Sequence, residues 1–399
     1  MRVLFVNVVC GVGSTGRIVT DLCAVLKSEG HQCLVAYGYG QSRAIAESDT
    51  VKTVGKAGYY AHNALAKLTD RTGLYSTAAT RRLIHKIEEF DPDVIHLHNL
   101  HGYYVNYEIL FAYLKWAKKP VVWTLHDCWP FTGHCAYFDA AGCEQWRTGC
   151  LRCSQLRSYP SCYLRGDVRR NFERKKAAFT GLDKLVLVTP SRWLAGLTEA
   201  SFMGDYPVQV IPNGIDLALF RPRESAFRRE HGWEDKILVL AVAGDWDARK
   251  GMEDVFALSQ LLDARYQTVM VGLRPEQMAQ VPDRVFAIER TDSPDALAEL
   301  YATADVLVNT TYEDNFPTVN LEALACGTPV ITYATGGSVE AADSSCGIVV
   351  EQGNVRAMAA AMESALRLDR ADARRRALCF DREARYRDYL ALYERLLQK

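Results

Sequence analysis

One stretch of the sequence, residues 313–322, carries the residue types needed to hold a phosphorylated ligand. It reads Glu-Asp-Asn-Phe-Pro-Thr-Val-Asn-Leu-Glu, and the pattern predicts a loop that runs into a helix. The amides of Thr318 and Val319 then lie at the N-terminus of that helix, where unpaired N–H groups and the helix dipole attract an anion. Glu322, one turn further along, can accept hydrogen bonds from ribose hydroxyls. The alternative is an acidic arrangement that only caps the helix.

A second group of charged residues follows a predicted strand at residues 236–243. Arg249 and Lys250 stand in the loop after this strand, where cations can neutralise a diphosphate, and Lys250 is the stronger candidate. Asp245 and Asp247 form an Asp-x-Asp pair of the kind that holds a divalent metal against a nucleotide. We favour the simpler interpretation, in which this pair makes a turn and caps a helix.

Three glycines precede the first predicted helix. Gly11, Gly13 and Gly16 follow a strand, which is the context of a phosphate-binding turn. A dinucleotide-binding turn also needs an acidic residue at the end of the second strand to hold the ribose, and residues 37–40 read Tyr-Gly-Tyr-Gly. The turn therefore favours a loop that lines a ligand cleft, with NAD binding and a plain tight turn as alternatives.

Six of the 12 cysteines fall within residues 128–162. Four of these six have a spacing that suits a metal site, and the last two of the four form a Cys-x-x-Cys pair. They are Cys135, Cys143, Cys150 and Cys153. Four thiolates satisfy a tetrahedral Zn²⁺, and a structural zinc would stabilise a loop that has little core of its own. Free cysteines and disulfides are the alternatives. His134 and Cys162 are further ligand candidates.

Basic residues gather in residues 165–176. They are Arg165, Arg169, Arg170, Arg174, Lys175 and Lys176. As a helix, this segment would show a cationic face. Such a face is either an ordinary solvated surface or a contact for anionic lipid head groups or a lipid diphosphate.

The composition excludes several classes of protein. The chain has 399 residues, 47 Lys and Arg against 48 Asp and Glu, and 49% hydrophobic residues. Disordered and fibrous classes are excluded, and a net charge of -1 gives no overall attraction to nucleic acid. No apolar run is long enough to span a bilayer. The N-terminus is typical of a first strand rather than of a signal peptide, so we expect a cytoplasmic protein.

Short β-branched runs alternate with amphipathic segments, which predicts two parallel sheets covered by helices. The expected strands are 3–9, 33–37, 94–98, 121–125 and 185–189, and then 236–243, 268–271, 285–288, 306–309 and 329–333. The expected helices are 18–28, 77–90, 106–117, 252–262, 294–302 and 319–326. Residues 139–181 lack a period and are expected to form an insertion or an ordered loop. We expect a first domain at 1–207 with a Cys-rich insertion at about 128–165, a second at 208–379, and a terminal helix at 380–399 that either closes the second domain or returns to the first.

Taken together, these segments resemble retaining glycosyltransferases of family 4. The resemblance rests on residues 314–331, 211–216 and 243–251, and it extends over nearly the whole chain. Residues 96–102 and 124–135 resemble, more narrowly, the branch that builds bacterial exopolysaccharides such as colanic acid. The resemblance implies a GT-B fold, in which two doubly wound, Rossmann-like α/β domains face each other across a cleft. It also implies sugar transfer from a nucleoside diphosphate donor with retention at the anomeric carbon, usually described by a front-face mechanism.

The family's donor-binding residues have matches in this chain. Lys250 matches the basic residue on the donor diphosphate, and Glu322 the carboxylate on the nucleotide ribose. The amides of Thr318 and Val319 match those on the distal phosphate. Asp314 stands where many members have Glu, in contact with donor sugar hydroxyls.

Two further residues match the family, and two positions depart from it. His126 matches a histidine near the donor sugar and the acceptor, where it either positions groups or acts as a base. Gly13 lies where the N-terminal loop of the family approaches the diphosphate. The family's usual Gly-Arg in the second phosphate loop is Gly-Asp at residues 244–245, so a cation is missing that Arg249 would have to replace. Pro317 replaces a Gly and removes one backbone donor.

The resemblance implies no cofactor for catalysis, a saccharide or lipid-linked saccharide as the acceptor, and a place at the inner face of the cell membrane. Three rival functions remain. One is a sugar-nucleotide epimerase of the same fold, and another is an NAD-dependent oxidoreductase that uses the turn at residues 11–16. The third is a zinc-stabilised binding module without activity.

Overall fold

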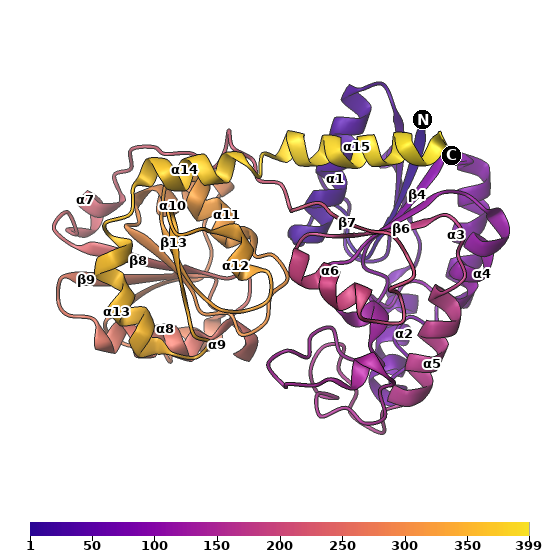
Figure 1. Ribbon diagram of the computed structural model, residues 1–399, viewed down its shortest axis with the longest axis horizontal. Helices are drawn as coiled ribbons and strands as arrows, with labels where there is room; N and C mark the ends of the chain where they lie inside the picture. The colour runs from indigo at the N-terminus through magenta and orange to yellow at the C-terminus, as the bar shows by residue number, and fades with distance from the viewer. Residues whose placement is uncertain (399) are drawn as a thin grey trace. The chain divides into compact units, whose positions relative to one another are not determined.

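Two parallel β-sheets, each covered by helices on both faces, make up the computed structural model, which describes residues 1–398 (Figure 1). The N-terminal unit comprises residues 1–212 and the C-terminal segment from Tyr386 onward. The C-terminal unit comprises Asn213–Arg385. Among residues 1–398, no helix combines the length and the apolar character needed to cross a membrane.

The sheet of the N-terminal unit has seven strands in the order β3-β2-β1-β4-β5-β6-β7. These strands are β1 (Arg2–Asn7), β2 (Gln32–Tyr37), β3 (Thr50–Lys52), β4 (Val94–Leu97), β5 (Val121–Thr124), β6 (Leu185–Thr189) and β7 (Val208–Val210). The helices are α1 (Gly13–Ser28), α2 (Lys56–Thr69), α3 (Thr77–Phe90), α4 (Tyr107–Ala117), α5 (Val168–Phe179), α6 (Arg192–Glu199) and α15 (Arg382–Leu397), the last counted from Tyr386.

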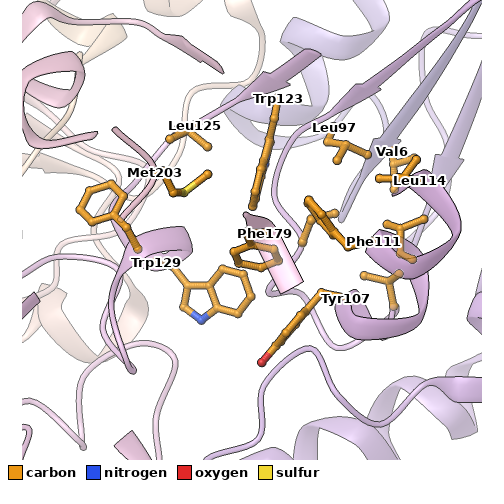
Figure 2. Packing of buried hydrophobic residues seen from close by; sticks show 14 of the residues in the cluster. Val6, Leu97, Tyr107, Phe111, Leu114, Trp123, Leu125, Trp129, Phe179 and Met203 are labelled. Atoms are coloured by element: carbon orange, nitrogen blue, oxygen red, sulfur yellow. The ribbon is translucent and has the colours of Figure 1, made fainter. Parts of the chain in front are cut away.

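Alternate strand residues of this sheet bury against different helices, as a sheet covered on both faces requires. Leu4 and Val6 share a core with α3, α4, α5 and α6, whereas Val3 and Phe5 share one with α1 and α15. The first of these cores is rich in aromatic rings, and Figure 2 shows Trp123 among them.

The sheet of the C-terminal unit has six strands in the order β10-β9-β8-β11-β12-β13. They are β8 (Ile237–Val242), β9 (Tyr266–Val271), β10 (Val285–Ile288), β11 (Val306–Asn309), β12 (Val330–Tyr333) and β13 (Gly347–Val350). The helices are α7 (Phe227–His231), α8 (Met252–Leu261), α9 (Pro275–Met278), α10 (Pro294–Thr303), α11 (Thr318–Ala325), α12 (Ser338–Ala341), α13 (Val355–Ala365) and α14 (Arg370–Leu378). Helices α10, α11 and α14 share one core, and α8 and α13 share the other.

All ten predicted strands and all seven predicted helices, including the terminal one, are confirmed, with ends that differ by five residues or fewer. The prediction of an insertion or loop over residues 139–181 is wrong at its end, because α5 occupies Val168–Phe179. This helix buries Phe172 and Phe179 against the first core. Its apolar positions are separated by many charged residues, which hid its period.

Both sheets reverse their strand order at one point. In the N-terminal unit this point lies between β1 and β4, and in the C-terminal unit it lies between β8 and β11. Loops at the carboxyl ends of such neighbouring strands diverge to opposite faces of the sheet, which leaves a crevice where ligands of open α/β sheets bind. Gly13, Lys250 and Asp314 follow strands that flank these points, and His126 follows β5, the neighbour of β4.

Candidate active site

Two loops of the C-terminal unit meet at its switch point, and backbone groups fasten them together. The loop after β8 carries Arg249 and Lys250, and the loop after β11 leads to α11. The Tyr312 amide donates to the Arg249 carbonyl at 2.7 Å, and Nη1 of Arg249 donates to the Glu313 carbonyl at 2.8 Å. The predicted diphosphate ligand Arg249 therefore holds the second loop in place.

Lys250 and Asp314 are brought together by this arrangement. Lys250 Nζ donates to Asp314 Oδ2 at 2.5 Å. Both side chains are partly buried, with 20% and 15% of their surfaces exposed. The pair is therefore shielded from solvent but still accessible to a ligand, and two residues predicted to contact different parts of a donor lie side by side.

Gly251 sets the close approach of the two loops. It has a left-handed backbone (φ 69°), and a Cβ built there would lie 2.3 Å from the carbonyl oxygen of Thr310. The Thr310 hydroxyl in turn donates to the carbonyls of Lys250 and Gly251 at 2.9 Å. Only glycine allows the chain to turn here and to place Lys250 against the second loop.

Helix α11 begins at Thr318, directly after the second loop, so the amides of Thr318 and Val319 are its first two. Helix geometry leaves these first amides without an acceptor inside the helix. Pro317 occupies the N-cap position and provides no side-chain cap. Glu322 lies one turn further along and is almost fully buried, and its Oε2 accepts a hydrogen bond from the Tyr301 hydroxyl at 2.7 Å.

The Asp-x-Asp pair forms a turn, as predicted. Asp247 is the N-cap of a short 3₁₀ helix, and its Oδ1 accepts from the Lys250 amide at 3.1 Å. Asp245 instead lies 3.3 Å from Nε of Arg274 in an exposed ion pair. The two carboxylates are thus engaged with different partners.

The glycine turn of the N-terminal unit has two parts. Gly11 packs tightly, since a Cβ there would lie 2.0 Å from the carbonyl oxygen of Arg43. Gly13, the first residue of α1, also has a positive φ of 65° but has open space where a Cβ would stand. Of the two, only Gly13 has open space beside its backbone, at the first residue of α1.

His126 follows β5, at the carboxyl edge of the sheet of the N-terminal unit. Its Nε2 lies 2.9 Å from Nδ1 of His98, which follows β4, and the two rings are stacked at 14°. Burial lowers the pKa of His126 to about 4, with Asp127 opposing the shift and His101 adding to it. Burial also holds the pKa of His98 well below the usual value. Both imidazoles are therefore neutral at pH 7.

His98 and His101 were not among the predicted site residues. Nε2 of His101 lies 2.9 Å from Oδ2 of Asp127, and its Nδ1 lies 2.8 Å from the Tyr159 hydroxyl. The sheet order could have indicated them. Strands β4 and β5 are adjacent and parallel, so the residues that follow their carboxyl ends lie close together.

The four cysteines predicted to bind zinc lie in one loop against the first core. Cys135 and Cys153 contact each other, and this hydrogen bond lowers the pKa of Cys153 to about 6. All twelve cysteines are free thiols. As their side chains stand, no group of three or more His, Cys, Asp or Glu residues within 1–398 could hold a metal ion. Zinc binding therefore remains a prediction, and the structure does not display the site.

The basic segment differs from a uniform cationic face. Lys175 is fully buried, and its Nζ donates to the carbonyls of Trp129 and Thr132 at 2.7 and 3.0 Å. Arg169 pairs with Glu173 at 3.0 Å, and Arg174 lies 3.6 Å from a carboxylate oxygen of α4. Including Lys175 in a surface patch was wrong. The exposed cations are Arg165, Arg169, Arg170 and Lys176.

Comparison with known families defines the class of protein. The family model "Glycosyltransferase Family 4" matches residues 15–219, just over half of the chain, and "Glycosyl transferases group 1" matches residues 224–378. The chain therefore belongs to glycosyltransferase family 4 and is a glycosyltransferase. The alternative of an NAD-dependent oxidoreductase loses its basis.

Particular relatives are similar over most of their length. WcaC of Escherichia coli K12, named a colanic acid biosynthesis glycosyl transferase, is 28% identical over 372 residues, which cover 89% of this chain and 88% of WcaC. The structure of sucrose-phosphate synthase from Thermosynechococcus elongatus matches with a TM-score of 0.71 at 17% identity, with 100% of both chains covered. HepE from Anabaena in complex with UDP-glucose matches with a TM-score of 0.68 at 14% identity over 99% of each chain. The fold is that of GT-B glycosyltransferases.

Proposed function

We propose that this protein transfers a sugar from a nucleoside diphosphate donor to a saccharide acceptor, with retention at the anomeric carbon. The observation that carries the proposal is the Lys250–Asp314 pair, which lies at the switch point of the second sheet in the loops that precede α8 and α11. In open α/β sheets this is the position where a nucleotide binds. HepE, of the same fold, is in complex with UDP-glucose.

Each part of the site has a role in this proposal. Lys250 and the first amides of α11 bind the diphosphate, and they stabilise the negative charge that grows on it as the glycosidic bond breaks. Glu322 accepts hydrogen bonds from the ribose hydroxyls, with its carboxylate oriented by Tyr301. Asp314 accepts hydrogen bonds from hydroxyls of the transferred sugar. Because Lys250 is already paired with Asp314, the incoming diphosphate must share or replace that partner.

In the N-terminal unit, we assign Gly13 to phosphate contact and His126 to the saccharide. The similarity to WcaC supports an acceptor that belongs to a bacterial surface polysaccharide, either free or lipid-linked. The exposed cations Arg165, Arg170 and Lys176 would then face anionic lipid. Flotation with vesicles that contain phosphatidylglycerol, compared with vesicles of phosphatidylcholine, tests this contact, and equal binding to both contradicts it.

A ligand series tests the function. Thermal unfolding is followed with UDP, GDP, ADP and NAD⁺, because a ligand at 100 times its Kd adds about 2.7 kcal/mol of stability. We expect one nucleoside diphosphate to stabilise the protein and NAD⁺ to have no effect. The matching nucleotide sugars are then incubated with and without saccharide acceptors, and the anomeric configuration of the product is read by NMR. Consumption of donor without an acceptor would favour the epimerase, and inversion would contradict retention.

A further inference from the structure

His98 is a buried histidine with one nitrogen in a hydrogen bond and one without a partner. Only 1% of the residue is exposed. Its Nδ1 lies 2.9 Å from Nε2 of His126. Its Nε2 is buried and has no hydrogen-bond partner among residues 1–398. The small hollow that His98, Trp123 and His126 help to line is too narrow for a water molecule.

Because Nε2 of His98 has no partner, it indicates which histidine donates the hydrogen bond between His98 and His126. A neutral imidazole carries its proton on one nitrogen only. If His126 donated from Nε2, Nδ1 of His98 would be the acceptor, and the proton of His98 would stand on the partnerless Nε2. A buried N–H without an acceptor is rare in proteins, whereas an unused acceptor is tolerated more often. His98 therefore carries its proton on Nδ1 and donates it to His126.

The ring of His98 is fixed by its neighbours. The indole N–H of Trp123 donates to the His98 carbonyl at 2.9 Å, and the ring of His96 packs against His98 with centroids 4.2 Å apart. His96 is bound on both sides, by the Tyr393 hydroxyl of α15 at 2.6 Å and by the Thr124 hydroxyl at 2.8 Å. His98 cannot easily turn over to offer its other nitrogen to His126.

We infer that His98 is a positioning residue that fixes His126 in the tautomer with the proton on Nδ1. His126 accepts from His98 through Nε2, and its remaining ring nitrogen is an N–H donor. It therefore donates a hydrogen bond to a saccharide oxygen, and it does not abstract a proton from the acceptor hydroxyl. This assignment rests on the proposed function for the role of His126, but the tautomer itself does not depend on it.

The tautomer is measured by two-dimensional ¹H–¹⁵N NMR of the imidazole nitrogens in the full chain, at a pH near 7. The protein has nine histidines, and the signal of His126 is identified by its loss in His126→Gln. Because protonated and bare imidazole nitrogens have widely separated ¹⁵N shifts, the spectrum reports which nitrogen of His126 carries the proton. We expect Nδ1, and a proton on Nε2 would overturn the inference.

Two variants of similar shape test the role of His98. In His98→Asn the side-chain amide can still donate to Nε2 of His126, whereas in His98→Leu nothing can. We expect His98→Asn to keep the wild-type tautomer and most of the activity. We expect His98→Leu to admit the Nε2–H tautomer and to lower kcat about 10-fold to 100-fold with little change in KM for the donor.

The two proposals fail in different ways. If no nucleotide sugar supports transfer, the proposed function fails, while the NMR spectra still decide the tautomer. If His98→Leu leaves the tautomer of His126 unchanged, the inference fails even in an active enzyme. His62→Leu serves as the control for damage to the fold, since His62 is also buried in the N-terminal unit, where its Nδ1 lies 2.7 Å from the Ser76 hydroxyl. It should leave the His126 signal in place.

Discussion

Lys250 and Asp314 are 64 residues apart in the sequence, yet their charged groups lie 2.5 Å from each other at the carboxyl edge of the second sheet. The carboxylate neutralises the lysine while the site is empty, and it repels a diphosphate that approaches the same lysine. If Lys250 binds the donor diphosphate as proposed, the pair lowers the affinity for this leaving group, although Asp314 is proposed to bind the sugar. This opposition can be measured.

The first prediction concerns these two charges. In Asp314→Asn, free nucleoside diphosphate should bind about threefold to tenfold more tightly, because a like charge is removed, while the rate of transfer should fall at least about tenfold. In Lys250→Ala both the affinity for the nucleoside diphosphate and the rate of transfer should fall. Calorimetric titration and a transfer assay measure them. Arg265→Ala removes an exposed cation of the same unit and should change neither quantity. Weaker binding in Asp314→Asn contradicts this account.

The second prediction concerns Glu322. Its carboxylate is proposed to bind the ribose, so Glu322→Gln should weaken binding of the nucleoside diphosphate about tenfold and leave inorganic pyrophosphate unaffected, since pyrophosphate has no ribose. Tyr301→Phe keeps the carboxylate but removes the 2.7 Å hydrogen bond that orients it, and should cost less. Competition of each ligand against a fluorescent nucleotide provides the measurement. An equal loss for both ligands would place Glu322 outside the ribose site.

The third prediction compares two glycines of the C-terminal unit. Gly251 and Gly232 both have positive φ, at 69° and 65°. A Cβ on Gly251 would lie 2.3 Å from the carbonyl oxygen of Thr310, whereas a Cβ on Gly232 would meet no atom within 4 Å. Gly232→Ala should cost about 1 kcal/mol, or about 2 to 4 °C in Tm, from backbone strain alone. Gly251→Ala should lower Tm at least twice as far and also weaken nucleotide binding. Equal losses in Tm would show that the loops after β8 and β11 move apart and accommodate the added methyl group.

The fold was largely predictable because its signals are local. Buried parallel strands are continuous apolar runs, and helices carry their periodicity within themselves, so strand β11 and helix α3 were predicted to the residue. Helix α5 was predicted as part of an insertion or loop because charged side chains interrupt its apolar face. The burial of Lys175 was not predicted, for a related reason. The carbonyls and the Trp129 ring that compensate its charge lie more than 40 residues earlier in the chain, where no local pattern can show them.

The candidate site was predictable only in part. The resemblance pointed to Lys250, Asp314 and Glu322, but not to the ion pair between the first two. Likewise His126 was named while His98, its hydrogen-bonding partner, was not. Such pairings depend on which strand ends are neighbours, and that is a property of the sheet order rather than of any segment.

The fourth prediction is that the Cys-rich loop binds zinc. Cys135 and Cys153 are in contact, and Cys143 and Cys150 belong to the same loop, so zinc binding would require the four side chains to rearrange around one ion. Metal analysis of chelator-washed protein should find about one zinc per chain, and Cys150→Ser should lower both the zinc content and Tm. Cys379→Ser, an exposed thiol far along the chain, is the control. Less than about half a zinc per chain would show that these cysteines are simply free thiols.

The fifth prediction concerns the buried Lys175. Burial lowers its pKa to about 7, while in the unfolded chain an unperturbed lysine titrates near 10.4. Between these two values the unfolded state binds one more proton than the folded state, so stability rises with pH, by at most about 1.4 kcal/mol per pH unit. Below pH 7 both states are protonated and this contribution is constant.

The measurement is the melting temperature of the wild type and of Lys175→Met from pH 6 to pH 9. The variant leaves the carbonyls of Trp129 and Thr132 without their donor, so its absolute stability should fall, but it cannot titrate at this position. The difference between the wild type and Lys175→Met should therefore increase above pH 7. The exposed neighbour Lys176 gives the control, because Lys176→Met should show a difference that does not vary with pH. A flat difference for Lys175→Met as well would mean that the buried amine keeps an ordinary pKa.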